Sequence, residues 1–234
     1  MEALALWTAV FTLGAYLVCG IPFGLVVALA MGHVDVRQVG SGNIGTTNVA
    51  REVGKSAAAL TLLLDVGKGL AWMLVSRQAI AALALGGDVA ALAHTTAFGA
   101  SMSVVFLGCI CGHVFSPYLR LHGGKGIAVG FGAALGLCWP VALGLLAVFV
   151  VLVVPTRYVS AGSLAAAASL PVWCAVFGFP PASVAPVAVA ALIVIWSHRE
   201  NVRRLAHGEE RRFSFHKKGQ PADRGADADE GGLR

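Results

Sequence analysis

The first segment with residue types suited to phosphate binding is a glycine-rich stretch near the N-terminus. It reads Gly-Ser-Gly-Asn-Ile-Gly-Thr-Thr-Asn-Val-Ala-Arg from Gly40 to Arg51. Its glycines let backbone amides converge on an anion, its Ser, Thr and Asn side chains are neutral donors, and its arginine can bind phosphate through two hydrogen bonds. It is not a Walker loop, because Val49 stands where that motif needs its first glycine. We expect phosphate ligands at Ser41, Gly42, Asn43, Thr47 and Arg51.

A second glycine-rich segment reads Leu-His-Gly-Gly-Lys-Gly and directly precedes an apolar stretch. If that stretch is helical, amides and an ammonium group stand at a helix N-terminus, where the helix dipole favours an anion. The alternative for Lys125 is an interfacial lysine that only extends to the membrane surface. We expect a second phosphate-binding site at Gly123, Gly124, Lys125 and Gly126.

A third polar segment reads His-Arg-Glu-Asn-Val-Arg-Arg-Leu and begins at His198, where the last apolar stretch ends. In a helix, His198 and Asn201 lie on one face and can point to the same site. A solvated helix beside the membrane is the alternative. Ser160, in a short polar turn, is a further candidate ligand, although a serine there can equally cap a helix. We assign catalytic roles to His198, Asn201 and Ser41, and substrate binding to Ser160.

Three ionisable residues, Asp65, Lys68 and His113, lie inside or at the end of apolar stretches. Charged groups inside a membrane are costly, so each is a functional hypothesis by default. Asp65 and Lys68 are three residues apart and can pair on a helix, either as a structural ion pair or as a pair that orients substrate. His113 is either a packing residue or part of the site. We expect these three residues to contact and orient the residues that bind phosphate, without binding it themselves.

The composition indicates a membrane protein. Hydrophobic residues make up 57% of the 234 residues and charged residues 12%, whereas soluble domains average about 25% charged residues. Apolar stretches cover 3–31, 56–76, 93–119, 126–138, 140–155, 161–177 and 182–197. We therefore predict an all-α bundle of about seven transmembrane helices. Because a span needs about 20 residues, the two stretches on either side of Pro140 can instead form a re-entrant hairpin, which leaves five spans.

The distribution of charge predicts the orientation. Of the 17 Lys and Arg residues, all but Lys68 and Arg77 fall in loops and in the C-terminal tail on one side. The positive-inside rule makes that side cytoplasmic, with the N-terminus in the periplasm and the C-terminus in the cytoplasm. Residues 1–210 form the predicted membrane domain. Residues 211–234, which are rich in charge, Gly and Ala, form a predicted disordered tail.

The three polar segments together resemble the motifs of the bacterial acyl-phosphate:glycerol-3-phosphate acyltransferases. That family has Ser-Gly-Asn-Ile-Gly-Ala-Thr-Asn-Val-x-Arg, a Gly-His segment followed by Gly-Gly-Lys-Gly, and His-Arg-x-Asn-x-x-Arg-Leu. All three occur here in that order, and the segment from Asp65 to Gly69 also fits the family. Thr46 stands where alanine is usual, and Ala50 where leucine is usual. The resemblance extends to about Glu210.

This resemblance implies transfer of a fatty acyl group from a long-chain acyl phosphate to the 1-hydroxyl of glycerol 3-phosphate. The products are lysophosphatidate and phosphate, in the first acylation of phospholipid synthesis. It implies the bacterial inner membrane, contact with membrane lipid, cytoplasmic active-site loops and a soluble enzyme that supplies acyl phosphate. We expect no metal, other cofactor or nucleic acid. Acyl phosphate is already activated, so we expect direct attack, with the hydroxyl proton passing to His198 or to a substrate phosphate.

A membrane transporter of a phosphorylated solute or lipid is the alternative function. Asp65 and Lys68 favour it, but the sequence has no evident internal repeat and its motifs gather at one face. CDP-alcohol phosphotransferases need metal-binding aspartates, and Asp35, Asp65 and Asp88 are far apart. Acyl-CoA-dependent acyltransferases carry a His-x4-Asp pattern, which none of the seven histidines begins.

Overall fold

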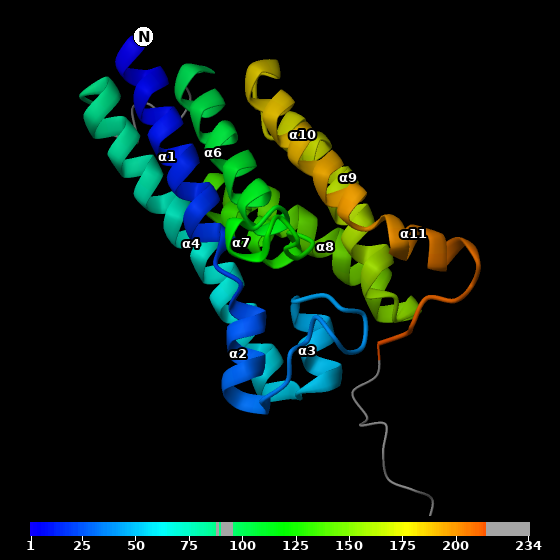
Figure 1. The fold of residues 1–234 in the computed structure, drawn as a ribbon. Helices are drawn as coiled ribbons and strands as arrows, with labels where there is room; N and C mark the ends of the chain where they lie inside the picture. Colours follow the sequence, from blue (N-terminus) through cyan, green and yellow to red (C-terminus); the bar gives the residue numbers. More distant parts are fainter. Residues whose placement is uncertain (88, 90–95, 214–234) are drawn as a thin grey trace, which may run out of the picture.

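The computed structural model describes residues 1–87, 89 and 96–213, and every regular element within them is helical (Figure 1). The predicted all-α fold is therefore confirmed for the described residues. The elements in chain order are α1 (Glu2–Gly20), α2 (Phe23–Gly32), α3 (Thr46–Glu52), α4 (Lys55–Leu85), α6 (Thr96–Val114), η1 (Pro117–Leu119), α7 (Ile127–Leu137), α8 (Trp139–Thr156), α9 (Val159–Val176), α10 (Pro181–Ser197) and α11 (Arg199–Ala206).

Several of these helices can cross a membrane. In the described part of the chain, five segments are long and apolar enough, and a sixth is added if α10 and α11, which meet at a 57° bend, count as one span. α7 has 11 residues, or about 16 Å of helix, roughly half the thickness of the hydrocarbon core. The helices are those of a multi-pass membrane protein, and the count of seven spans stays a prediction. The five segments are Glu2–Gly32, Lys55–Leu85, Thr96–Leu119, Trp139–Thr156 and Val159–Val176.

The main core lies where α1, α4, α6, α7 and α10 pack together, with Phe106 and Met73 among its fully buried side chains. α7 lies directly against α4. A Cβ on Gly132 of α7 would lie only 2.0 Å from the carbonyl oxygen of Val66. Small residues allow this contact between backbones, which stabilises helix pairs in lipid, where apolar side chains gain little by burial. The short α7 is thus fixed inside the bundle, with its N-terminus directly after the second glycine-rich segment.

Large apolar side chains cover much of the outside of the bundle. On α8, Val151 is 69% exposed and Val154 is 71% exposed. Leu63 on α4 and Leu192 on α10 are similarly exposed. Exposed apolar surface of this extent is unfavourable in water and is the expected outer surface of a membrane protein.

A second, smaller core lies beyond one end of the bundle, where α2, α3 and the start of α4 meet (Figure 1). The loop between α2 and α3 folds back over α2. Gly24 permits this close approach, because a Cβ there would lie 1.7 Å from the carbonyl oxygen of Ile44. The first glycine-rich segment is therefore held by its own core. That core consists of Leu25, Val27, Ala28, Val36, Ile44, Val49, Ala57 and Ala58.

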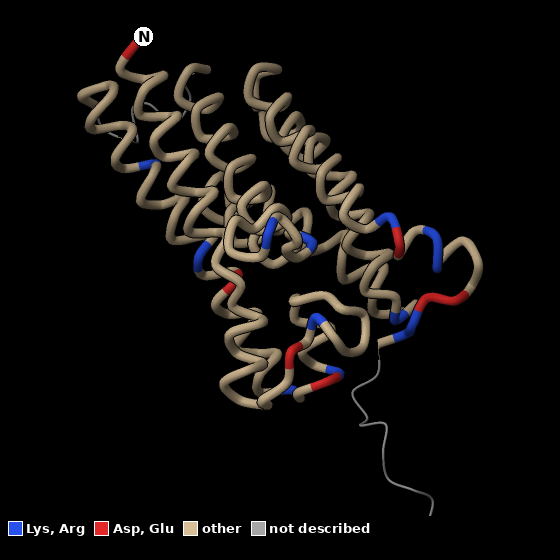
Figure 2. The backbone as a smooth tube through the Cα atoms, in the orientation of Figure 1, with Lys and Arg blue, Asp and Glu red and all other residues tan. Residues whose placement is uncertain are grey.

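The charged residues are unevenly distributed. Lys and Arg gather at the end of the bundle away from the N-terminus, around α3, α11 and the neighbouring loops (Figure 2). The last described residues return to this end: the Phe213 amide donates to the Arg157 carbonyl at 2.8 Å, and the Arg212 guanidinium lies over the Tyr158 ring. Most of the predicted tail, residues 214–234, lies outside the described residues. The domain boundary after residue 210 stays a prediction.

Candidate active site

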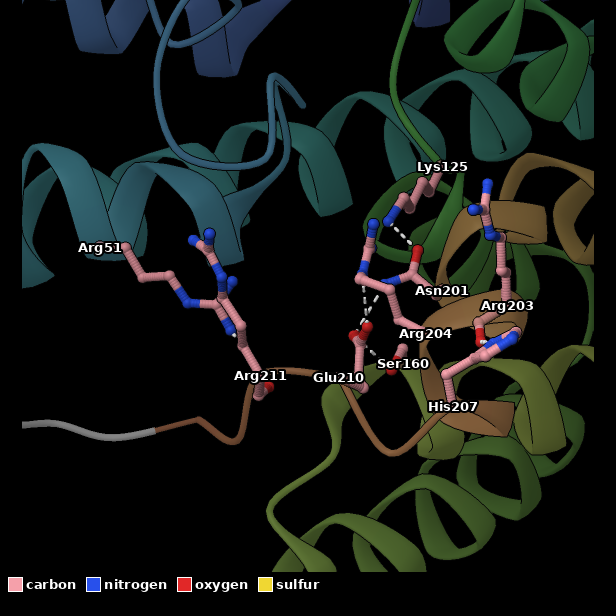
Figure 3. Close-up of polar contacts among 9 residues, drawn as sticks. All are labelled: Arg51, Lys125, Ser160, Asn201, Arg203, Arg204, His207, Glu210 and Arg211. Carbon is pink, nitrogen blue, oxygen red and sulfur yellow. Dashed lines mark hydrogen bonds and ion pairs between the residues drawn. The ribbon is translucent and has the colours of Figure 1, made fainter.

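Polar side chains from three separate segments meet at the charged end of the bundle (Figure 3). Lys125, in the loop before α7, donates a hydrogen bond to the Asn201 side-chain oxygen on α11. The Asn201 side-chain nitrogen in turn donates to Glu210 Oε1 at 2.8 Å. Ser160, in the first turn of α9, donates to the same carboxylate oxygen at 2.7 Å. The fold thus brings together three of the predicted site residues, Lys125, Ser160 and Asn201.

Glu210 and Arg204 complete this group and were not among the predicted site residues. Arg204 Nε lies 2.8 Å from Glu210 Oε2, and the Glu210 side chain is only 9% exposed. Burial opposes ionisation of this carboxyl, but hydrogen bonds from Arg204, Ser160 and Asn201 outweigh it and lower the pKa of Glu210. Arg204 was visible in the sequence three residues after Asn201, on the same helix face. We call Lys125, Ser160, Asn201, Arg204 and Glu210 the Glu210 cluster.

Lys125 has an unusual environment for a lysine. Burial and, to a lesser extent, repulsion from Arg204 and Arg51 lower the pKa of Lys125, Glu210 raises it, and the net result is a pKa of about 8. Near neutral pH the group is mostly charged, and an arriving phosphate stabilises that charge. An anion bound beside Lys125 would therefore favour its charged form.

The first glycine-rich loop is organised around Asn48, a buried residue that was not assigned to the site. The Ser41 amide donates to Asn48 Oδ1 at 2.9 Å, and Asn48 Nδ2 donates to the Val36 carbonyl at 2.9 Å. Gly40 lies so close that a Cβ there would be 2.3 Å from Asn48 Oδ1. Asn48 belongs to the quoted motif, but its backbone partners have no sequence pattern that identifies them.

Other residues of this loop shape the backbone. Asn43 Oδ1 accepts the Gly45 amide at 2.8 Å, where α3 begins. Gly42 has φ 69, which glycine adopts readily, and its amide donates to the Val39 carbonyl at 3.0 Å. Thr47 lies in the first turn of α3. The predicted phosphate-binding roles of Asn43 and Thr47 stay predictions.

Arg51, near the end of α3, faces the chain that leaves α11. Its guanidinium donates to the Arg211 carbonyl at 3.4 Å, and burial together with the neighbouring Arg211 charge lowers its pKa. In Figure 3, Arg51 lies beside Arg211, whereas Lys125 lies beside Asn201, next to Glu210. The two cations expected to bind phosphate thus come from different elements, α3 and the loop before α7.

His198 is buried between α10 and α11. Its Nδ1 lies 2.8 Å from the Val194 carbonyl oxygen, and because a carbonyl only accepts, Nδ1 carries the proton in this contact. The lone pair of the neutral ring is then on Nε2, as a general base requires. Among the hydrogen bonds of the described residues, none joins His198 or the Ser41 side chain directly to the Glu210 cluster, but Ser197 Oγ lies 3.4 Å from His198 Nδ1 and donates to the Lys125 carbonyl at 3.2 Å.

The second glycine-rich loop differs from the expectation in one respect. The Gly123 and Gly124 amides each donate at 3.0 Å to carbonyls at the end of α6, those of Val114 and His113. They are therefore engaged within the protein, and Gly42 is engaged likewise. In this structure these amides hold the loops together, and the predicted substrate-binding roles of Gly42, Gly123, Gly124 and Gly126 stay predictions. Gly126, with φ 83, begins α7.

The three predicted supporting residues form one buried group. Lys68 Nζ lies 2.7 Å from Asp65 Oδ1 and donates to the Ile21 carbonyl, also at 2.7 Å. It also lies 3.2 Å from His113 Nδ1. All three side chains are nearly inaccessible, at 2% for Asp65, 7% for Lys68 and 4% for His113.

The fold and the Glu210 cluster define a class: a helical multi-pass membrane protein with a cation-rich polar site at one end. A family model described as glycerol-3-phosphate acyltransferase matches residues 9–208. The glycerol-3-phosphate acyltransferase of Geobacter sulfurreducens is 42% identical over 204 residues, covering 87% of this chain and 96% of that one. That of Rhodopseudomonas palustris strain BisB5 is 40% identical over 210 residues, covering 90% and 97%. The chain belongs to the glycerol-3-phosphate acyltransferase family and is an acyltransferase.

Solved structures agree. The crystal structure of PlsY, an integral membrane glycerol 3-phosphate acyltransferase, in its glycerol 3-phosphate form superposes with a TM-score of 0.75. It is 33% identical, and the match covers 88% of this chain and 96% of that one. The lysophosphatidic acid form of PlsY gives a TM-score of 0.74 at 32% identity, covering 89% and 96%. The family predicted from the motifs is confirmed.

Proposed function

We propose that this acyltransferase moves a fatty acyl group from a long-chain acyl phosphate to the 1-hydroxyl of glycerol 3-phosphate. The products are 1-acyl-glycerol 3-phosphate and phosphate. The observation that carries the proposal is the convergence of Lys125, Ser160 and Asn201 around one carboxylate. Donors that converge on an anion of the protein are suited to converge on a phosphate. The ligand forms of PlsY support this acceptor and product.

The chemistry asks little of the enzyme beyond positioning and charge neutralisation. The 1-hydroxyl oxygen bonds to the acyl carbonyl carbon, the bond from that carbon to the phosphate oxygen breaks, and phosphate leaves with the electron pair. The hydroxyl proton passes to His198 Nε2 or to a phosphate oxygen. Because phosphate is a good leaving group, no covalent intermediate is needed. Arg51 and Lys125 neutralise the charge on the phosphates and on the developing oxyanion.

An acyl phosphate donor also fits the distribution of cations. Each proposed substrate carries a phosphate, and the site has cations on two elements, Arg51 on α3 and Lys125 before α7. The site lies at the end of a bundle whose outer surface is apolar, so the acyl chain can remain in lipid while its phosphate reaches the cations. One phosphate alone would not require two cationic elements.

We also propose a topology and a setting. The gathering of Lys and Arg at the site end supports a cytoplasmic site in a bacterial inner membrane, with a periplasmic N-terminus. Seven spans, a cytoplasmic tail at 211–234 and a soluble enzyme that supplies acyl phosphate complete the proposal. Glu2→Cys and His207→Cys test the sidedness. An impermeant thiol reagent added to whole cells should label only the first, and labelling of only the second would invert the topology.

Variants at the two cations test the activity. Purified protein in detergent, given glycerol 3-phosphate and palmitoyl phosphate, should form lysophosphatidate. Lys125→Ala and Arg51→Ala should each lower kcat/KM by about 100- to 1,000-fold, the usual cost of losing one charge-stabilising group. Arg77→Ala, a cation on α4 outside the site, is the matched control and should have little effect. Equal losses in all three variants would contradict the site.

The transporter alternative is separated by a flux measurement. Protein reconstituted in sealed vesicles should form product without moving glycerol 3-phosphate across the membrane. Concentrative or exchange uptake in the absence of any acyl donor would favour transport.

A further inference from the structure

The buried group of Asp65, Lys68 and His113 lies between two parts of the molecule that the activity needs. On one side it contacts the break between α1 and α2, through the hydrogen bond from Lys68 to the Ile21 carbonyl. On the other side it contacts the second glycine-rich loop through His113. This group does not belong to the Glu210 cluster, but His113 contacts Gly124, the residue that precedes Lys125.

Within this group, the positive charge of Lys68 is balanced by the negative charge of Asp65. Lys68 Nζ has three partners: Asp65 Oδ1, the Ile21 carbonyl and His113 Nδ1. The Asp65 contact is an ion pair without hydrogen-bond geometry, whereas the Ile21 carbonyl and His113 Nδ1 can each accept one of the three ammonium hydrogens. A buried ion pair adds little net stability, but removing one partner leaves a costly unpaired charge. A group of this kind is better explained by the geometry it fixes than by the stability it adds.

His113 carries that geometry to the loop. Because Lys68 only donates, His113 Nδ1 is the acceptor and the ring proton is on Nε2. The Nε2 edge packs against Gly124 so closely that a Cβ there would lie 2.2 Å away. The His113 carbonyl accepts the Gly124 amide at 3.0 Å. Backbone and side chain of one histidine therefore both fix Gly124, and the next residue is Lys125.

We propose that Lys68 and His113 are positioning residues that hold the Gly123–Gly126 loop so that Lys125 reaches Asn201 and the substrate phosphate. Asp65 neutralises Lys68 in this arrangement. The effect of this positioning on catalysis rests on the proposed function, whereas its effect on the geometry of the loop does not. Lys125 is anchored from both ends: its carbonyl accepts from Ser197 Oγ at 3.2 Å, and its ammonium contacts Asn201.

Four variants separate positioning from general stability. His113→Leu removes the acceptor for Lys68, whereas His113→Asn keeps an acceptor near the Nδ1 position. Because Lys68→Met alone would leave Asp65 unpaired, it is combined with Asp65→Asn, which leaves no buried charge. The matched control is Trp72→Phe, which removes a 2.9 Å hydrogen bond from α4 to the Phe11 carbonyl on α1, away from the loop.

Two readouts are taken on each variant in detergent. Hydrogen–deuterium exchange of peptides covering 121–126 should become at least about tenfold faster in His113→Leu and in the double variant, because the amides of Gly123 and Gly124 lose their fixed geometry. Exchange in the first glycine-rich loop should not change. kcat/KM for glycerol 3-phosphate should fall by about 10- to 100-fold, the cost of misplacing a charged group by about 1 Å. His113→Asn should recover part of both effects, and Trp72→Phe should show neither.

The two readouts make failures distinguishable. Unchanged exchange at 121–126, or equal acceleration across the whole chain, would overturn the positioning role even if activity falls. Faster exchange at 121–126 with unchanged kcat/KM would overturn the link from the loop to catalysis. Absence of acyl transfer in the unmodified protein would contradict the proposed function and would leave the exchange result to decide the loop geometry alone.

Discussion

Glu210→Gln and Arg204→Gln should move the pH dependence of this enzyme in opposite directions. The pKa of Lys125 is about 8, because burial and the Arg204 charge lower it and the Glu210 charge only partly opposes them. The free enzyme therefore loses this cation as pH rises through about 8. Since kcat/KM reports groups of the free enzyme, it should decline on the alkaline side with an apparent pKa of about 8.

The size of the change follows from the geometry. Asn201 bridges Lys125 and Glu210 with one hydrogen bond on each side of its amide, so the two charges lie roughly 7 Å apart. At that separation and effective dielectric constants of about 20 to 80, unit charges interact by roughly 0.6–2.4 kcal/mol, or about 0.4–1.7 pKa units. Glu210→Gln should lower the apparent pKa by an amount in this range. Arg204→Gln should raise it, because the guanidinium that is removed repels the Lys125 ammonium group.

The assay is kcat/KM for glycerol 3-phosphate between about pH 6 and pH 10, corrected for the spontaneous hydrolysis of acyl phosphate. Lys125→Arg is the control, because a guanidinium stays charged throughout this range. Its alkaline decline should disappear, and adding Glu210→Gln to it should shift nothing. Shifts in the same direction for both substitutions, or an alkaline decline that survives in Lys125→Arg, would refute the reasoning.

Gly123→Ala and Gly124→Ala should each lower the free energy of unfolding by about 1–3 kcal/mol, and with it the melting temperature. The new Cβ would lie 2.0 Å from the His113 carbonyl oxygen at Gly123 and 2.2 Å from His113 Nε2 at Gly124. In a His113→Ser background, Gly124→Ala should cost little stability, because the group it meets is the His113 side chain, whereas Gly123→Ala should still be destabilising, because it meets the backbone carbonyl. Equal recovery of stability for both substitutions would contradict this packing. Thr46→Ala should stabilise by about 1 kcal/mol or be neutral, because the hydroxyl is buried and has no hydrogen-bond partner in the described chain. A lower melting temperature for Thr46→Ala would contradict this prediction. Removing residues 214–234 should leave kcat/KM unchanged, and lost turnover in a folded truncation contradicts that.

Hydropathy predicted where helices occur, and local chemistry decided where they end. The predicted stretch 161–177 corresponds closely to α9, Val159–Val176. The stretch 3–31 instead breaks into α1 and α2 at Ile21 and Pro22, where proline cannot supply an amide to a helix. The stretch 56–76 continues as α4 to Leu85, because a polar run that includes Arg77 does not stop a helix near a membrane surface.

The site was predictable where motif residues supply side chains and not where distant chain segments fold back. Lys125, Ser160 and Asn201 were expected from their motifs and meet in the Glu210 cluster. Glu210 lies beyond α11, after a turn at Gly208 with φ 70. No periodicity indicates that this irregular segment returns to the site. Its contacts depend on packing between elements that sequence spacing does not encode.

The central claim is tested most directly by giving the purified protein glycerol 3-phosphate with palmitoyl phosphate, palmitoyl-CoA or palmitoyl-acyl carrier protein in parallel and measuring lysophosphatidate and released phosphate. Turnover with palmitoyl phosphate alone, with one phosphate released for each lysophosphatidate formed, is the predicted result. Turnover with either thioester and none with palmitoyl phosphate would contradict the donor, and with it the argument that both substrates bring a phosphate to Arg51 and Lys125.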